Sequence, residues 1–167
     1  MSFADAVKQF NCRDTGVGDF LINRAIEFDK RNVARTYLLL EKEAFERSEF
    51  IIAAYFTLAN KPLTLGNTLS KSTIKEIDGF SKEAVSVGSI ILGQLGKNEN
   101  IDDNVSGSEI MKMVFEQIPK VTDVIGGRIM FLECQNSAGL IAFYERNGFS
   151  YLQKNESSGL LQFVRRL

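Results

Sequence analysis

The sequence has 167 residues, of which 44% are hydrophobic and 25% are charged, so the chain is neither disordered nor fibrous. We expect residues 1–167 to form a single domain, because a chain of this length can bury one substantial core. A net charge of −1 gives no global sign of a nucleic-acid-binding or membrane-surface protein. No apolar run reaches the ~18 residues of a membrane span, and the start of the chain lacks the pattern of a signal peptide. A soluble, cytoplasmic protein is therefore expected.

Two residue types limit the chemistry. The chain has no histidine, which excludes Ser-His and Cys-His nucleophile pairs and most zinc sites. Cys12 and Cys134 are too few for a disulfide scaffold or a four-cysteine zinc site. We therefore expect no metal, and any catalysis has to use carboxylates, tyrosine, cysteine, lysine, backbone amides or a cofactor.

The first part of the chain predicts one helix and two strands. Residues 18–30 carry apolar side chains at helical spacing, with Asp19 as the N-cap. Residues 36–40 and 50–59 are rich in β-branched and aromatic side chains and flank a charged segment. We expect them to pair as antiparallel strands, the second buried on both faces because its apolar residues do not alternate.

The rest of the chain alternates strands with helices. Thr73 and Glu76 fit a capping box for a short helix over residues 73–80. The other predicted elements are strands at 84–95, 126–134, 149–154 and 160–167, and helices at 109–118 and 137–147. The first of these helices is expected to end before Pro119. Strands interleaved with helices predict an α/β or α+β sheet.

Two backbone segments are candidate binding sites. Ser106 and Glu109 fit a capping box, and a helix start that follows a glycine-bearing loop presents amides and a positive dipole suited to a phosphate. A capped surface helix without a ligand is the alternative. The strand end at residues 95–97 is able to hold an extended amide-containing ligand by strand-like hydrogen bonds, with an ordinary strand terminus as the alternative.

The stretch "AFYERNGF" predicts a defined helix end. Asn136 or Ser137 is expected to cap the helix, and Gly148 to end it. A Schellman ending would join the Phe149 amide to the Tyr144 carbonyl. The Tyr144 side chain has two interpretations: a core residue, or an exposed phenol with a pKa near ~10 that serves as a proton donor.

The order of these features resembles the GNAT acetyltransferase superfamily. The specific match is to that family's N…AxxFYExxGF segment, which this chain carries as Asn136, Ala142, Phe143, Tyr144, Glu145, Gly148 and Phe149. The resemblance covers the last half of the chain. It implies a mixed, mostly antiparallel sheet flanked by helices and splayed between the fourth and fifth strands. The first half resembles a bacterial and phage branch that includes toxins acetylating aminoacyl-tRNA.

The resemblance also implies acetyl-CoA as cosubstrate and assigns roles to residues. Leu95, Gly96 and Lys97 would contact the pantetheine through their backbone and Asn136 through its side chain, while Tyr144 would protonate the leaving sulfur. The pyrophosphate would lie against Asn104, Val105, Ser106, Gly107 and Ser108. The family's Q/R-x-x-G-x-G/A loop is matched only at Gly107, and Asp102 stands where a basic residue or Gln is usual. An acid there is adverse beside a phosphate.

The general base and the acceptor are less defined. Glu133 is a candidate base, with a structural ion pair as the equal alternative. An α-amine with a pKa near ~8 is substantially neutral at pH 7.5 without a base, which favours an aminoacyl acceptor over a lysine. Binding tRNA needs a basic surface, for which Lys30, Arg31, Arg35, Arg165 and Arg166 are the candidates, with a solvated face as the alternative.

The sequence therefore predicts an acetyl-CoA-dependent N-acetyltransferase. Two alternatives stay open: an enzyme that acetylates small-molecule or protein amines, and a non-catalytic acyl-CoA-binding or regulatory module. The resemblance further implies a homodimer and, in the toxin branch, a small antitoxin partner.

Overall fold

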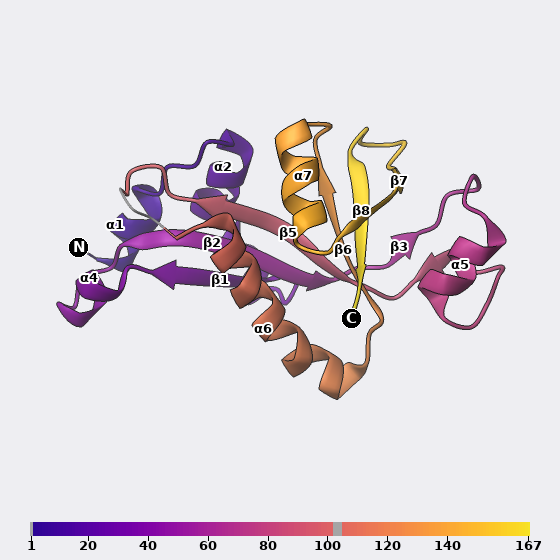
Figure 1. Ribbon diagram of the computed structural model, residues 1–167. Coiled ribbons are helices and arrows are strands. Elements are labelled where there is room, and N and C mark those ends of the chain that lie inside the picture. The colour runs from indigo at the N-terminus through magenta and orange to yellow at the C-terminus, as the bar shows by residue number, and fades with distance from the viewer. Residues whose placement is uncertain (1, 102–104) are drawn as a thin grey trace. The chain divides into compact units, whose positions relative to one another are not determined.

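The computed structural model describes residues 2–101 and 105–167. The chain divides into two compact units, one formed by Met1–Ala59 and Gly93–Phe115, the other by Asn60–Leu92 and Glu116–Leu167 (Figure 1). Strand β5 (Ile90–Lys97) and helix α6 (Gly107–Ile125) each contribute to both units. The prediction of a single domain stays a prediction.

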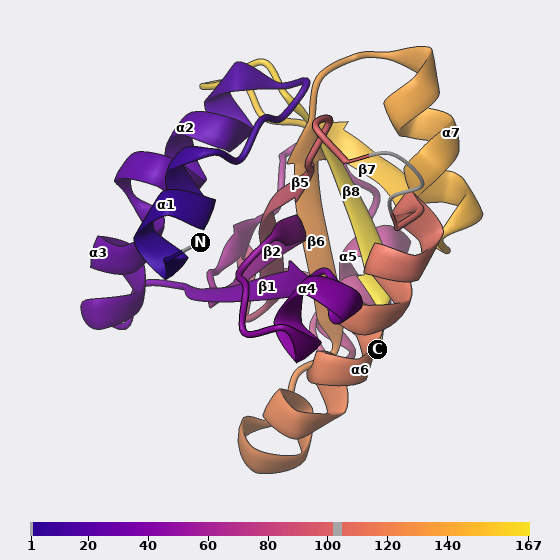
Figure 2. The same cartoon turned by 90° about the vertical axis from the view of Figure 1, so that its left-hand side faces the viewer.

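The first unit is built around two strands, β1 (Arg35–Leu40) and β2 (Ile52–Asn60). Besides parts of β5 and α6, it contains four short helices: α1 (Phe3–Lys8), α2 (Thr15–Asn23), α3 (Ala25–Lys30) and α4 (Lys42–Glu46). β1 and β2 are antiparallel and the first seven residues of β2 are buried, as predicted. Figure 2 shows α1 to α3 on one side of these strands and the first half of α6 on the other, which explains why both faces of β2 are apolar.

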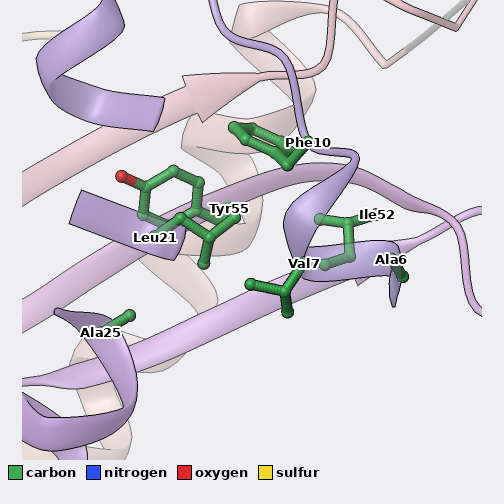
Figure 3. Close-up of a cluster of buried hydrophobic side chains, with 7 residues drawn as sticks. All are labelled: Ala6, Val7, Phe10, Leu21, Ala25, Ile52 and Tyr55. Carbon is green, nitrogen blue, oxygen red and sulfur yellow. The ribbon is translucent and has the colours of Figure 1, made fainter. Parts of the chain in front are cut away.

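The side chains between the short helices and β2 form one core cluster. Val7 of α1, Leu21 of α2 and Ala25 of α3 meet Tyr55 of β2, and all four are buried (Figure 3). Phe10 meets the Tyr55 ring edge-on, with 5.4 Å between ring centroids. Helices of six to nine residues are too short to be stable alone, so this apolar contact holds them in place.

The structure corrects three local predictions in this unit. The helix expected over residues 18–30 forms as α2 and α3, because Arg24 between them has a non-helical backbone (φ −126°, ψ −33°). The N-cap is Asp14, whose carboxylate accepts hydrogen bonds from the amides of Gly16 and Val17, so the prediction of Asp19 was wrong. The charged segment before β2 contains α4, which was not predicted and which Glu41 caps.

The second unit holds the remaining strands. Its elements are β3 (Leu63–Thr64), α5 (Lys71–Asp78), β4 (Ser86–Val87), β6 (Ile129–Cys134), α7 (Ala138–Arg146), β7 (Ser150–Lys154) and β8 (Leu161–Arg166). β7 and β8 form the predicted antiparallel closing hairpin. On its other edge, β8 pairs antiparallel with β6. α7 lies against this part of the sheet (Figures 1 and 2).

Three predictions fail in the second unit. Ser70 caps α5 by accepting from the Thr73 amide, so the proposed Thr73–Glu76 capping box was wrong; Glu76 instead forms an ion pair with Arg166. The strand predicted over 84–95 is two strands, β4 and β5. Pro119 does not follow α6 but lies inside it, since one lost backbone hydrogen bond does not end a helix that has a buried apolar face.

The described strands hydrogen-bond in the order β1-β2-β5-β6-β8-β7, a mixed and mostly antiparallel sheet as the sequence predicted. The parallel pairing of β5 with β6 covers only the three pairs from Ile90–Met130 to Leu92–Leu132. No helix in residues 2–101 and 105–167 combines the length and apolar character needed to cross a bilayer.

Candidate functional site

The end of α7 has the predicted Schellman geometry. The Phe149 amide donates to the Tyr144 carbonyl at 3.1 Å, and the Gly148 amide donates to the Glu145 carbonyl at 3.0 Å. Gly148 has φ of 81°, and a methyl group there would lie 2.5 Å from Nη1 of Arg165. The positive φ is the reason for glycine at this position, and a side chain would in addition displace the end of Arg165.

This helix end fixes the ring of Tyr144 in an aromatic cluster. The ring packs edge-on against Phe143 at 5.0 Å and Phe149 at 6.0 Å between centroids. The side chain is 9% exposed, so the ring lies in the core, which agrees with the first of the two interpretations. Burial, with a smaller contribution from Cys134, raises the pKa of Tyr144 to about 12. The phenol is therefore fully protonated at neutral pH and acts there only as a hydrogen-bond donor or acceptor.

Among the described residues, the Tyr144 hydroxyl has no hydrogen-bond partner that serves the fold. In the described part of the chain, no group forms a hydrogen bond with it. A core tyrosine normally places its hydroxyl on a partner, so this side chain keeps a donor that a ligand can use.

The other predicted site residue of the second unit is Asn136. It is exposed in the turn between β6 and α7, one residue before the N-cap Ser137, which makes no side-chain capping bond. Asn136 and Tyr144 therefore stand near opposite ends of α7, about 12 Å apart along its axis.

In the first unit, the end of β5 is held by tight packing. Gly96 is buried, and a methyl group on it would lie 2.8 Å from Val17 and 2.9 Å from the ring of Tyr55. The neighbouring Leu95 and Lys97 are partly buried. Gly96 is thus required by packing, whatever its part in ligand binding.

Asn98 fixes the strand end and was not predicted. It is 5% exposed. Its backbone amide donates to the Ala53 carbonyl at 2.9 Å, and its side-chain amide donates to the Ile52 carbonyl at 2.8 Å. Its side-chain oxygen accepts from the amides of Asn11 and Asn100. A single polar residue after an apolar strand gives no sequence signal for such a role, since its partners lie far away in the chain.

The predicted phosphate loop is partly described. Asn104 lies outside the described residues, as does Asp102, whereas Val105 and Ser106 precede α6 and Gly107 and Ser108 are its first two residues. The predicted capping box is present: the Ser106 amide donates to the Glu109 carboxylate at 2.7 Å, and the Glu109 amide donates to the Ser106 hydroxyl at 3.2 Å. Hydrogen bonding to Ser106, through its side chain first and its backbone amide second, lowers the pKa of the Glu109 carboxyl. A carboxylate therefore already occupies the start of α6, where a phosphate would bind.

Glu133 on β6 is half-buried and held by amides. The side-chain amides of Asn155 and Gln162 each donate to its Oε1 atom at 2.7 Å. Within residues 2–101 and 105–167, no lysine or arginine forms an ion pair with it. The structural ion pair considered as an alternative to a base is therefore not formed.

The candidate basic surface is partly neutralised. Lys30 and Arg31 both pair with Glu27, and Arg35 pairs with Asp29 at 3.0 Å. Arg166 pairs with Glu76, and Arg165 donates to the Asn147 carbonyl. A solvated face of paired charges is the better description of both clusters. The described part of the chain also holds no group of three or more His, Cys, Asp or Glu that could bind a metal.

Comparisons with known proteins place this fold. The sequence matches no family profile and no curated protein. Among solved structures, a complex of AtaT with acetyl-methionyl-tRNAfMet is similar with a TM-score of 0.72 and 20% identity, covering 94% of this chain and 85% of that one. A tyrosine-to-phenylalanine mutant of KacT gives a TM-score of 0.74 with 21% identity, over 97% and 89% of the two chains.

A structure of AtaTR bound with acetyl-CoA is similar with a TM-score of 0.71 and 20% identity, covering 98% of this chain and 90% of that one. The chain thus has the GNAT-type fold, and the solved structures that share it include those of AtaT and KacT. At these identities the likeness shows the fold, and activity has to be argued from this chain's residues.

Proposed function

We propose that the chain is an acetyl-CoA-dependent N-acetyltransferase that uses Tyr144 as general acid and an aminoacyl α-amine as acceptor. The observation that carries this proposal is the Tyr144 hydroxyl, which a Schellman helix end and two aromatic rings hold in place without a structural hydrogen-bond partner. Further support comes from the fold, since AtaT has been solved with acetyl-CoA and with acetyl-methionyl-tRNAfMet.

In the proposed reaction, the neutral acceptor amine attacks the thioester carbon, the carbon–sulfur bond breaks and the CoA sulfur leaves with the bonding electrons, while the proton that the nitrogen loses passes to solvent. A thiol has a pKa near ~8.5, about 3.5 units below that of the buried phenol. Complete transfer of the phenolic proton would cost about 5 kcal/mol at that difference. Tyr144 is therefore proposed to donate a hydrogen bond to the sulfur as negative charge develops, with little net proton transfer.

The binding of acetyl-CoA is assigned to the residues that the sequence predicted. Backbone groups of Leu95, Gly96 and Lys97 and the exposed Asn136 are proposed to hold the pantetheine. The loop from Asn104 to Ser108 is proposed to hold the pyrophosphate, which has to displace the Glu109 carboxylate from the Ser106 amide. We expect this competition to weaken the binding of CoA.

An α-amino acceptor is favoured because an α-amine with a pKa near ~8 is partly neutral at pH 7.5, whereas a lysine amine near ~10.4 is not. A release assay for CoA thiol tests this proposal at pH 7.5 with acetyl-CoA and charged tRNA, amino acids, polyamines or lysine peptides. We expect turnover with α-amines and the largest kcat/KM for an aminoacyl group. Faster acetylation of lysine peptides would contradict the choice of acceptor.

The same assay separates the alternative functions. Turnover with polyamines or peptides alone indicates an enzyme for small-molecule or protein amines. Binding of acetyl-CoA without turnover of any amine indicates a non-catalytic acyl-CoA-binding or regulatory module.

A small antitoxin and a second copy of the chain are the proposed partners, in a cytoplasmic setting. AtaT has been solved with the C-terminus of the antitoxin AtaR, and KacTA with DNA, which supports a partner of that kind here. The net charge of −1 and the paired basic clusters lead us to expect a weak, salt-sensitive contact with tRNA by this chain alone.

A further inference from the structure

A groove of about 910 Å³ lies within the second unit over strands β6, β8 and β7. Phe131 of β6 and Gln162 of β8 are buried in its lining, and the segment after β3 forms another wall with Gly66. This volume is within the range of small-molecule sites. The groove contains the Glu133 carboxylate, to which neither the fold nor the reaction as described so far gives a role.

The sheet register brings three polar side chains into one row across the groove. Glu133 of β6 is opposite Gln162 of β8, which is opposite Gln153 of β7. The last pairing depends on a β-bulge: the register shifts between Tyr151 and Gln153, so that Leu152 is skipped and Gln153 takes its place. A bulge that redirects a side chain into a groove is a feature associated with binding sites.

The amides in this row are aligned in one direction. Gln153 accepts from the Gly66 amide at 2.8 Å and donates to Oε1 of Gln162 at 2.6 Å. Gln162 then donates to Oε1 of Glu133 at 2.7 Å. Because each amide donates toward the carboxylate, the chain of dipoles stabilises a negative charge at its end.

A second amide restrains the same carboxylate oxygen. The Asn155 side chain donates to Oε1 of Glu133 at 2.7 Å, while its own oxygen accepts from the Ser157 amide at 3.0 Å in the turn between β7 and β8. Oε1 thus receives two donors. A carboxylate accepts about four hydrogen bonds, and Oε2 has no hydrogen-bond donor in the described part of the chain.

Glu133 is a half-buried carboxylate that neutral amides orient and that forms no ion pair in the described part of the chain, so a positive ligand reaching Oε2 would stabilise it. The other charged side chains in the groove lining are Lys61, Lys154 and Glu156, all exposed. We propose that this groove binds the acceptor as a primary ammonium ion, with Glu133 as the anchoring group and Asn155, Gln162 and Gln153 as positioning residues. The proposal rests on the proposed function, since it locates the amine which that reaction would consume; the ammonium ion is the bound form, and its nitrogen has to lose a proton before it attacks the thioester.

The aliphatic and aromatic groups of the lining fit the rest of such a ligand. Phe131 and Leu152 line the groove with apolar groups, and Phe131 lies two residues before Glu133 on β6, on the same face of the sheet. An amine with a short apolar side chain and a neutral carbonyl group, as in an aminoacyl ester, satisfies both parts of the groove. A free amino acid fits less well, because its carboxylate would add a second negative charge near Glu133.

Direct binding to the full chain tests the proposal without any turnover. The probes are methioninamide and N-acetylmethioninamide, measured by titration calorimetry at pH 6.5, where an α-amine with a pKa of about 8 is charged. We expect the charged probe to bind about ten- to a hundred-fold more tightly than its acetylated form. Equal binding of the two probes by the wild-type chain would overturn the proposal.

Substitution then locates the site. Glu133→Gln keeps an Oε1 acceptor for both amides but removes the charge, and we expect it to abolish the preference for methioninamide. Glu156→Gln is the matched control, since it removes an exposed charge from the same groove and is expected to change the preference less than two-fold. Glu133→Asp should retain part of the preference.

The outcomes distinguish this inference from the proposed function. Loss of the ammonium preference in Glu133→Gln, in a chain that shows no turnover with acetyl-CoA, supports the ammonium site and contradicts the enzyme. Turnover together with an unchanged preference in Glu133→Gln supports the enzyme and overturns the ammonium site. The ammonium site is also overturned if Glu156→Gln lowers the preference for methioninamide as much as Glu133→Gln does.

Discussion

Each unit of the molecule has a buried tyrosine next to a cysteine, and the two differ in what their hydroxyl groups do. Tyr55 on β2 is 0% exposed, and its hydroxyl donates to the Val17 carbonyl at 2.5 Å. Tyr144 on α7 is 9% exposed, and its hydroxyl has no partner in the described part of the chain. Burial raises the pKa of both phenols above the ordinary value.

The comparison shows that a raised pKa by itself does not identify a functional tyrosine. Both phenols remain protonated at neutral pH, but the proton of Tyr55 is used to attach α2 to β2, whereas that of Tyr144 is not used structurally. A phenol whose donor is not used by the fold remains available to a ligand, and such a group is a candidate for chemistry.

The largest expected effect comes from Tyr144→Phe. Removal of the hydrogen-bond donor for the leaving sulfur is expected to lower kcat by about 10²- to 10⁴-fold, with little change in affinity for acetyl-CoA. Thiol release and calorimetry measure the two quantities. Tyr37→Phe is the matched control, since that ring stacks on Phe56 at 4.9 Å in the other unit.

The pH dependence sharpens this prediction. Because the pKa of Tyr144 is raised to about 12, its hydroxyl should remain a donor up to about pH 11, and no loss of rate below that pH should arise from its ionisation. A rate that falls with a pKa near 10 in the wild type but not in Tyr144→Phe would contradict the buried position. Retention of full activity in Tyr144→Phe would instead assign this tyrosine to the core.

The sequence predicted the local parts of this site and missed those that depend on distant contacts. Tyr144, Gly148 and Phe149 belong to one helix end, and Ser106 and Glu109 to one helix start; both motifs have a fixed spacing and were confirmed. Capping predictions failed at Asp19 and at Thr73, where an equally suitable residue stood a few positions earlier. Several side chains of the same type within one turn make the sequence signal ambiguous.

Residues whose role depends on contacts between distant parts of the chain had no sequence motif that indicated this role. Gly96 is required because Val17 and Tyr55 approach its α-carbon, and Asn98 because it bonds to β2. The row from Gln153 to Glu133 exists only through strand register and a bulge. A single sequence contains the residues but not the pairing of strands, so these parts of the site became visible only in the structure.

A smaller effect, on stability, is expected for Tyr55→Phe. The substitution leaves the Val17 carbonyl of α2 without its donor, and we expect the free energy of unfolding to fall by about 1 kcal/mol. Urea denaturation measures this change, and thiol release should stay within two-fold of the wild type. Tyr144→Phe should show the reverse pattern, with stability unchanged or slightly higher. Equal loss of stability in both variants would remove the distinction between the two tyrosines.

The smallest expected effect concerns the start of α6, where Glu109 accepts from the Ser106 amide. Glu109→Gln keeps a capping-box residue but removes the negative charge that a pyrophosphate would meet, and we expect acetyl-CoA to bind about two- to five-fold more tightly at low salt. Glu116→Gln, exposed two turns further along the same helix, is the matched control and should change the affinity less. Because exposed charges are screened, the gain should shrink at high salt. Weaker binding by Glu109→Gln would mean that the capping carboxylate orders this loop for the cosubstrate instead of competing with it.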